Sequence, residues 1–349
     1  MDGRARLITL LACLAALVVT ACTATDTPTT YDIPLSTMGT TGVVRVVTSD
    51  PSDTSGLSAR IDGLLVEVND EMSTYIPTST ISRFNDSADS VTDLSETVHM
   101  RHVLRLAQAV HDTTDGAFDP TIMPLVRYWG FAGGEAPADV DSAVIDSLRA
   151  RVGMDRLEWV DGVHDESLLR RRTPGIELDL SAIAKGHGVD AVSDLLTARG
   201  LTDHMVEIGG EVRCSGRTEA GTVWRIGIER PDIDERGLYA AVPVDQAGMA
   251  TSGNYRNVRT TADGRTVWHT IDPVTGYPVE RDVLSATVIA PNCALADGLA
   301  TACMVLGSVP CLDVLRSMDD VEGLLILGDA DGGFATQRTA GFPEVQVLE

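Results

Sequence analysis

The feature that most constrains the fold is a run of short β-type segments between Leu201 and Ala290. Segments such as HMVEIGG, VWRIGIE, LYAAVPV and TVWHTID are rich in β-branched and aromatic residues. The short links between them favour antiparallel pairing, since a parallel pair needs a long crossover. Because helical patterns precede and follow this run, we predict an α+β fold of mainly antiparallel sheets with packed helices.

The spacing of apolar residues predicts the helices that cover these sheets. In LSARIDGLLVEVNDEM the apolar residues recur at intervals of three and four. A second helix is expected in LSETVHMRHVLRLAQAVHDTT with Ser95 as its N-cap, and a third in DVDSAVIDSLRARVG, closed by Gly153. A fourth, in GVDAVSDLLTARG, should end before Gly200. TTGVVRVVT, GIELDL and EGLLILGD are predicted strands.

The first 21 residues have the order of a secretory signal peptide: two arginines, then LITLLACLAALVV, then small residues before Cys22. The apolar run is too short to span a bilayer comfortably. A cysteine in this position resembles a bacterial lipobox, in which Cys22 becomes the lipidated first residue. The alternative is an ordinary signal peptide with an incidental cysteine. We therefore expect residues 22–36 to form a lipidated N-terminus and flexible tether, which holds the domain at the periplasmic face of the cell membrane.

The net charge of the chain limits the classes of molecule that its surface can bind. With 27 Lys and Arg against 51 Asp and Glu, the formal net charge is -24. Nucleic acid and anionic lipid are therefore poor partners for its general surface. An anionic substrate would need a local cation in order to bind here.

Four cysteines remain once Cys13 leaves with the signal and Cys22 carries lipid: Cys214, Cys293, Cys303 and Cys311. They lack CxxC spacing, which argues against a zinc site. An oxidising compartment allows one disulfide, but the spacing does not choose the pair. Buried free thiols are the alternative.

The stretch CALADGLAT has the pattern of a buried helix interrupted by a charge. Helical residues at i and i+4 lie on the same face, so the Asp297 carboxylate and the Thr301 hydroxyl would converge on one point. Two oxygens that face one point can hold a hard cation. The alternative is an aspartate at a helix N-terminus and a threonine that bonds back to the preceding turn.

Six stretches contain more glycine, acidic and small polar residues than packing requires. In chain order they are MSTY, DGAFDPTIMPLV, LDLSAIAKGHGVD, VEIGGEVRCSG, HTIDPVTGYPV and ADGLAT. Their order and spacing resemble the FAD:protein FMN transferase (ApbE-type) family, from about Met38 to the C-terminal region. The resemblance implies a T-fold-like architecture for a flavin transferase domain over residues 37–349.

The resemblance also implies a reaction. Members of the family cut FAD at its pyrophosphate and join the FMN half, through a phosphoester, to a threonine or serine of an acceptor protein, and AMP leaves. Mg²⁺ would be held by Asp297, Thr301 and the backbone carbonyl of Ala182, and this ion prefers such oxygen ligands. His269 would activate the acceptor hydroxyl, a task suited to an imidazole near neutral pH.

A set of contacts to the flavin nucleotide is implied as well: Met38, Tyr75, Ala117, Phe118, Asp119, Asp179, Lys185 and Ile271. Lys185 would place a compact positive charge on the nucleotide, although a solvated lysine at a helix start is the alternative. Tyr75 offers an aromatic face for stacking on the isoalloxazine. Core packing is the alternative for Phe118, a structural cap for Asp179, and a strand end for His269.

Three departures from the family pattern affect the contacts expected between the protein and the nucleotide. Thr80 and Ile81 stand in STISRFN where the family commonly reads SELSRFN, GHGVD replaces GYAVD, and Gly298 replaces an alanine in ADGLAT. None removes an implied ligand. Two other functions stay open: a Mg²⁺-dependent pyrophosphatase that splits FAD into FMN and AMP, and a non-catalytic lipoprotein that stores FAD. The acceptor implied by the resemblance is a subunit of an extracytoplasmic redox complex.

Overall fold

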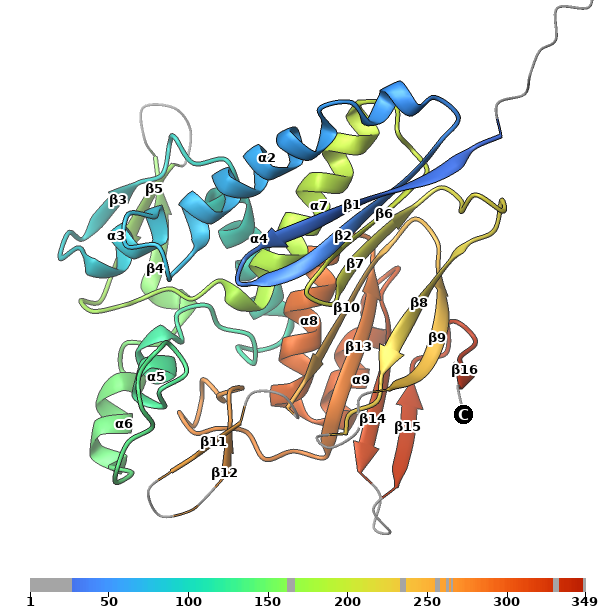
Figure 1. Cartoon of the computed structure of the whole chain (residues 1–349). Helices are drawn as coiled ribbons and strands as arrows, with labels where there is room; N and C mark the ends of the chain where they lie inside the picture. Colours follow the sequence, from blue (N-terminus) through green and yellow to red (C-terminus); the bar gives the residue numbers. More distant parts are fainter. Residues whose placement is uncertain are drawn as a thin grey trace, which may run out of the picture.

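A computed structural model describes residues 27–161, 167–232, 237–254, 258–261, 264, 266–328 and 333–347. Its centre is an eight-stranded sheet of order β1-β2-β6-β7-β10-β13-β14-β15 (Figure 1). All neighbouring strands in it are antiparallel. The strands are β1 Thr29–Thr37, β2 Thr40–Thr48, β6 His204–Ile208, β7 Glu211–Ser215, β10 Gly248–Gly253, β13 Val283–Ala290, β14 Glu322–Gly328 and β15 Phe334–Arg338. This confirms the predicted α+β fold.

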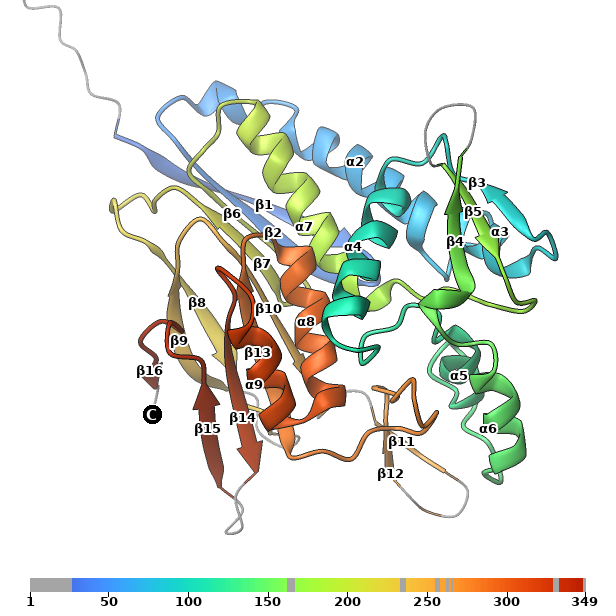
Figure 2. The same ribbon diagram turned by 180° about the vertical axis from the view of Figure 1, so that it is seen from behind.

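Helices cover one face of this sheet (Figure 2). They are α2 Leu57–Met72, α4 His99–Thr113, α7 Ser181–Ala198, α8 Cys293–Leu306 and α9 Ser308–Arg316. In α2 the predicted apolar stripe is buried at Ile61, Leu65, Val68 and Met72. Burying such a stripe against the sheet is the main source of stability for a helix of this length. Within the described residues, no helix is long and apolar enough to cross a membrane.

A smaller sheet covers the opposite face. It pairs β16 Gln346–Val347, β9 Leu238–Val244 and β8 Trp224–Glu229, in that order. Along β9 the buried residues alternate, with Ala240, Val242 and Val244 inside. These side chains share a core with Met205 and Ile289 of the large sheet. The large sheet therefore lies between a helical layer and a second sheet, which is why nearly all of its inner strand β13 is buried.

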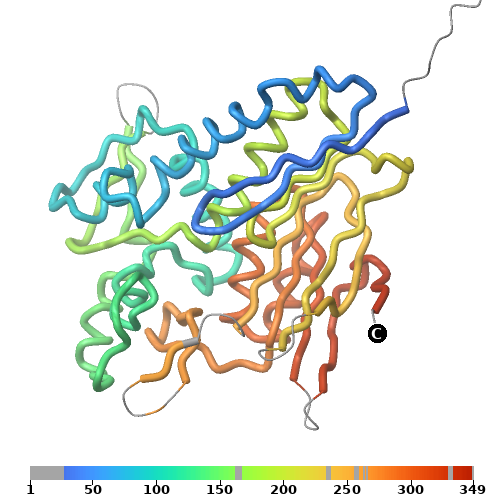
Figure 3. Tube along the Cα trace, viewed as in Figure 1, coloured from blue at the N-terminus to red at the C-terminus, as the bar shows by residue number. Residues whose placement is uncertain are grey.

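A long excursion separates β2 from β6, and it carries most of the helices (Figure 3). It contains η1 Pro51–Thr54, α3 Thr80–Asp86, α5 Met123–Tyr128, α6 Ser142–Arg149, η2 Met154–Arg156 and the small sheet of β3 Val91–Asp93, β4 Leu157–Val160 and β5 Leu168–Arg171. The hairpin of β11 Val258–Thr260 and β12 Thr266–Trp268 lies beside α5 and α6 in both ribbon views. A hydrogen bond of 2.9 Å from Trp129 Nε1 to the Gly276 carbonyl ties these regions together.

The predicted start of the second helix is wrong. The helix α4 begins at His99, and Ser95 lies outside it. Glu71 of α2 accepts hydrogen bonds from the backbone N–H groups of Val98 at 3.1 Å and Met100 at 2.7 Å. The unpaired amides of the first turn are thus satisfied by a side chain of another helix.

Other boundaries also differ from the expectation. GIELDL contains an isolated bridge between Glu177 and Ile122 rather than a strand. The helix α6 ends at Arg149, before Gly153. Residues 29–36, expected in the tether, belong to β1, because they pair along β2 and bury Leu35. The predicted signal peptide and Cys22 lie outside the described residues.

Candidate functional site

The start of α8 is held by side chains from outside the helix. Asn292 is its N-cap and accepts a hydrogen bond from Leu295 N at 2.8 Å. The carboxylate of Asp190, from α7, accepts hydrogen bonds from the N–H groups of Cys293 at 2.9 Å and Ala294 at 2.8 Å. A negative charge is favourable at a helix N-terminus, which fixes α7 and α8 to each other at this point.

Two glycines allow the backbone to approach this helix start closely. A Cβ placed on Gly186 would lie 2.5 Å from the Cys293 carbonyl oxygen, and one on Gly248 would lie 2.3 Å from Cys293 N. Any side chain would therefore push α7 or β10 away from α8. At the other end of α8 a disulfide joins Cys303 to Cys311 of α9. Cys214 and Cys293 are buried free thiols, which settles the pairing that the sequence left open.

Asp297 lies one turn into α8 and is almost fully buried, with 2% of its surface exposed. Its Oδ2 accepts a hydrogen bond of 3.0 Å from Gly186 N, and its Oδ1 faces Lys185 Nζ at 3.7 Å. Asp297 is therefore directed at α7, and Asn292 and Asp190 take the capping role that was the alternative for it. The Thr301 hydroxyl lies 3.2 Å from Ser252 Oγ of β10.

Where α7 meets α8, the oxygen atoms of Asp297, Thr301 and the Ala182 backbone suit a hard cation. We call these residues, together with Lys185, the Asp297 corner. In a regular helix Gly186 N–H pairs with the carbonyl four residues earlier, that of Ala182. Here it donates to Asp297 at 3.0 Å, and a backbone carbonyl has two lone pairs, so the Ala182 carbonyl has capacity for a further partner. A carboxylate, a hydroxyl and a carbonyl are ligands that Mg²⁺ accepts, with water and phosphate oxygens completing its shell. The described chain holds no cluster of three or more His, Cys, Asp or Glu side chains that could bind a metal by themselves.

Lys185 lies between two buried carboxylates. Its Nζ is 2.8 Å from Glu211 Oε1 on β7, and Glu211 is only 4% exposed. Burial raises the pKa of Glu211 to about 7, with Lys185 opposing this rise and Asp297 adding to it. Burial alone would lower the pKa of Lys185, but Asp297 and Glu211 outweigh it, and that pKa lies above its ordinary value.

The loop after α4 carries three of the implied flavin contacts. Ala117 and Phe118 are buried, and Phe118 packs in the main core. Asp119 Oδ1 accepts hydrogen bonds from Thr121 N at 2.8 Å and Thr121 Oγ1 at 2.6 Å, and burial raises its pKa. The flavin role of this loop stays a prediction, and the core packing of Phe118 is the arrangement that the structure shows.

The Asp119 loop is joined to the start of α7. Asp179 N donates to the Pro120 carbonyl at 2.7 Å, and Asp179 Oδ1 accepts a hydrogen bond of 2.9 Å from Ser181 N. This second bond gives Asp179 a structural role just before α7, although Leu180 and not Asp179 is the N-cap of the helix. Met38 reaches α7 from the turn between β1 and β2, where a Cβ on Gly188 would lie 2.8 Å from Met38 Cε. Tyr75, in contrast, stands 77% exposed after α2.

His269 follows β12, with its ring centroid 6.4 Å from that of Phe131. The adjacent Thr270 Oγ1 donates to Asn254 Oδ1 at 2.9 Å, just beyond the end of β10. Ser252, two residues earlier, is the partner of Thr301. The His269 segment and the Asp297 corner therefore meet at the same end of β10.

A hydrogen-bonded turn follows His269, as the sequence predicted. Asp272 Oδ1 accepts a hydrogen bond of 2.8 Å from Val274 N, and Gly276 N donates to the Asp272 carbonyl at 2.7 Å. Ile271, an implied flavin contact, is 5% exposed and packs with Leu125 and Trp129 in the lobe of α5 and α6. Its flavin role stays a prediction.

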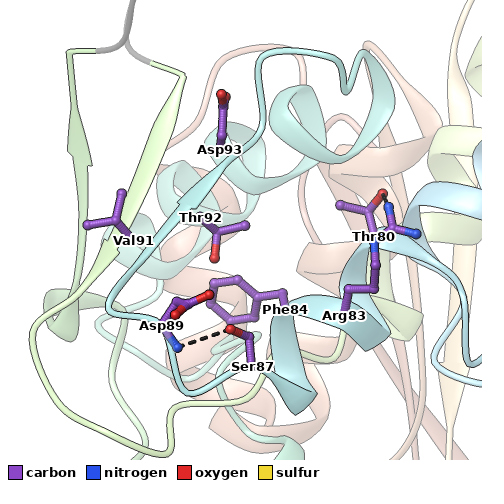
Figure 4. Close-up of a pocket in the computed structure, with 8 residues that line it drawn as sticks. All are labelled: Thr80, Arg83, Phe84, Ser87, Asp89, Val91, Thr92 and Asp93. Carbon is purple, nitrogen blue, oxygen red and sulfur yellow. Dashed lines mark hydrogen bonds between the residues drawn. The ribbon is translucent and has the colours of Figure 1, made fainter.

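Two hollows mark the surface. One of about 310 Å³ lies between α3 and β3, and its lining holds none of the implied site residues (Figure 4). The other, of about 450 Å³, is lined by the end of α4 and the loop that follows it, together with Val152, Gly153, Pro273 and Val274. It brings Asp119 close to the turn that follows His269.

Two residues of this site had no role in the sequence analysis. Glu211 lies within VEIGGEVRCSG and Asp190 ends GHGVD, so both stand in the motifs that were singled out. A further signal was the composition, because Lys185 is the only lysine among the 349 residues.

Comparison with known proteins agrees with the geometry. The ApbE family matches residues 38–325. The FAD:protein FMN transferase of Vibrio cholerae is 39% identical over 309 residues, covering 88% of this chain and 90% of the relative. That of Haemophilus influenzae is 35% identical over 315 residues, covering 88% and 89%.

Solved structures agree as well. The flavin transferase ApbE from Vibrio cholerae superposes with a TM-score of 0.78 at 36% identity, covering 90% of this chain and 98% of that one. The apo flavinyl transferase ApbE of Pseudomonas stutzeri gives 0.79 at 32% identity, covering 90% and 95%. From the matched span, these identities and the shared fold, this chain belongs to the ApbE family.

Proposed function

We propose that this protein is a FAD:protein FMN transferase, which moves FMN from FAD to a threonine or serine hydroxyl of an acceptor protein and releases AMP. The observation that carries the proposal is the corner where α7 meets α8. There an acidic protein places its only lysine beside Asp297, with the Thr301 hydroxyl one turn further along the helix. The relatives that match most of the chain are named for this activity.

The residues of the Asp297 corner have different binding roles in the proposed reaction. Asp297, Thr301 and the Ala182 carbonyl would hold Mg²⁺, which when bound supplies positive charge against the pyrophosphate oxygens. Lys185 provides a compact ammonium for a nucleotide phosphate. Tyr75, exposed in the structure, is available for stacking on the isoalloxazine.

His269 acts on the acceptor. Its imidazole takes the hydroxyl proton while the hydroxyl oxygen forms a bond to the FMN phosphorus. The bond between that phosphorus and the bridging pyrophosphate oxygen breaks, and AMP leaves. Replacing His269 by alanine should slow transfer by about 10² to 10⁴ fold, the usual contribution of a positioned general base. The affinity for FAD should change little, because this residue contacts the acceptor.

The sequence alone supports the location. The signal-like start and the cysteine at position 22 indicate a lipid-anchored protein outside the cytoplasm. The acceptor would then be a subunit of a redox complex with its hydroxyl on the same side of the membrane.

The test uses the purified chain with FAD, Mg²⁺ and an acceptor domain that has an exposed threonine. Mass spectrometry should detect a covalent FMN adduct on the acceptor and an equal amount of AMP. Asp297→Asn should abolish both products, whereas Asp313→Asn, at a 67% exposed side chain on α9, should leave them unchanged. Release of AMP without an adduct would identify a pyrophosphatase. Bound FAD without AMP would identify a carrier.

A further inference from the structure

Glu211 is a buried carboxylate with one oxygen left over. Its Oε1 pairs with Lys185, but Oε2 is buried and has no hydrogen-bond partner among the described residues. Leaving a buried acceptor without a partner is unfavourable, so an unpaired oxygen beside a functional site calls for an explanation.

The partner of Glu211 is unusual in this chain. Lys185 is the only lysine, so every other basic side chain except histidine is an arginine. A guanidinium is planar and binds carboxylates with two parallel hydrogen bonds, whereas an ammonium is a compact point charge on a flexible stem. A position that keeps lysine in such a sequence points to a cation that must be small and able to move.

The Lys185 ammonium also lies closer to one of its two carboxylate neighbours than to the other. Its Nζ is within hydrogen-bond distance of Glu211 at 2.8 Å but is 3.7 Å from Asp297 Oδ1. The other oxygen of Asp297 is already committed to Gly186 N. The ammonium therefore faces the Asp297 oxygen that accepts no backbone N–H, while its shorter contact is to Glu211.

We propose that Lys185 is a built-in counter-ion of the metal site, which a divalent cation displaces from Asp297, and that Glu211 is the positioning residue that retains the displaced ammonium. This rests on the metal site of the proposed function. On displacement, the second Glu211 oxygen offers the ammonium a new acceptor. The lysine would thus stabilise Asp297 before the metal binds and stay close enough to meet a phosphate afterwards.

The inference predicts opposite effects for the two partners. Lys185→Met removes a like charge from beside the metal and should tighten metal binding about tenfold. Glu211→Gln removes the anion that retains the ammonium, so Lys185 competes for Asp297 and binding should weaken about tenfold. Lys185→Arg should also weaken binding, because a guanidinium can hold Asp297 with two hydrogen bonds.

The experiment measures Mn²⁺ binding to the FAD-free full chain by electron paramagnetic resonance, and Mg²⁺ binding by calorimetry. Asp297→Asn serves as the reference variant without a site, and thermal unfolding checks that each variant is folded. A second measurement needs no variant: the chain labelled with ¹⁵N-lysine has one side-chain signal, which should shift during a Mg²⁺ titration with the affinity found by calorimetry.

The outcomes separate the two proposals. If the wild-type chain shows no binding that Asp297→Asn removes, the metal site itself is wrong. If that site exists but Lys185→Met and Glu211→Gln leave its affinity unchanged, only the counter-ion inference is overturned. A lysine signal that stays in place at metal saturation would overturn it as well.

Discussion

A buried histidine of α7 should make the protein sensitive to mild acid. His187 Nε2 lies 2.9 Å from His99 Nδ1, and its ring centroid is 5.6 Å from that of His102. Burial, followed by the charges of His99 and His102 on α4, lowers the pKa of His187 from 6.5 to about 3. The folded protein therefore keeps this imidazole neutral over a range in which the unfolded chain protonates it.

The size of the effect follows from this difference. Above pH 6.5 both states hold His187 neutral, so it adds no pH dependence. Between pH 6.5 and about 3 the unfolded state binds one more proton, and stability falls by up to about 1.4 kcal/mol per pH unit. Between pH 7.5 and pH 5.0 the loss from this residue is about 2 kcal/mol.

Urea unfolding at pH 7.5 and pH 5.0, followed by circular dichroism, measures this loss. His187→Gln cannot take up the proton. Between pH 7.5 and pH 5.0 the loss in its free energy of unfolding should therefore be about 2 kcal/mol smaller than the loss in the wild type. Arg60→Gln, at an exposed position of α2, is the control and should follow the wild type, because an arginine does not titrate in this pH range. Equal pH dependence in the wild type and His187→Gln would refute the reasoning.

Three further changes test other parts of the structure. Gly186→Ala should destabilise the protein by about 1–3 kcal/mol in urea, because its Cβ meets α8 backbone, whereas Gly63→Ala, with nothing within 4 Å, should stabilise α2 by about 0.5–1 kcal/mol. The same loss for both glycines would contradict the close approach. Reducing the Cys303 to Cys311 bond should lower the free energy of unfolding by about 2–3 kcal/mol, and unchanged urea midpoints with reductant would count against it. Cys22→Ser should release the protein from membranes or leave it unprocessed, and the lipobox reading is wrong if both forms fractionate alike as soluble protein.

The sequence predicts elements well where the signal is local. The stripe of α2 and the strand β2 are found at their predicted places, since the period of apolar residues directly reflects which face is buried. The start of α4 was missed because its capping group is Glu71, which belongs to a different helix. A cap supplied across a tertiary contact leaves no trace in the neighbouring sequence.

In the site, too, contacts within one helix could be predicted and contacts between distant segments could not. Asp297 and Thr301 could be paired from their spacing, because four residues make one helical turn. The contact of Lys185 with Glu211 joins a helix to a strand, and the bond of Asp190 to the start of α8 spans about a hundred residues of chain. Such partners depend on how the layers pack, and periodicity carries no information about that.

The excursion between β2 and β6 also has a consequence for how the chain folds. The β1 and β2 hairpin can form early, but Val44 of β2 finds its partner Val206 only after the whole helical excursion has been made. Closing a loop of this length is entropically costly and slows the pairing. Until then, β2 has an unpaired edge with apolar residues in the growing chain. Such an edge promotes aggregation. The first strands to be synthesised therefore keep this edge exposed until β6 has been made, and aggregation through the edge should limit the yield of folded protein.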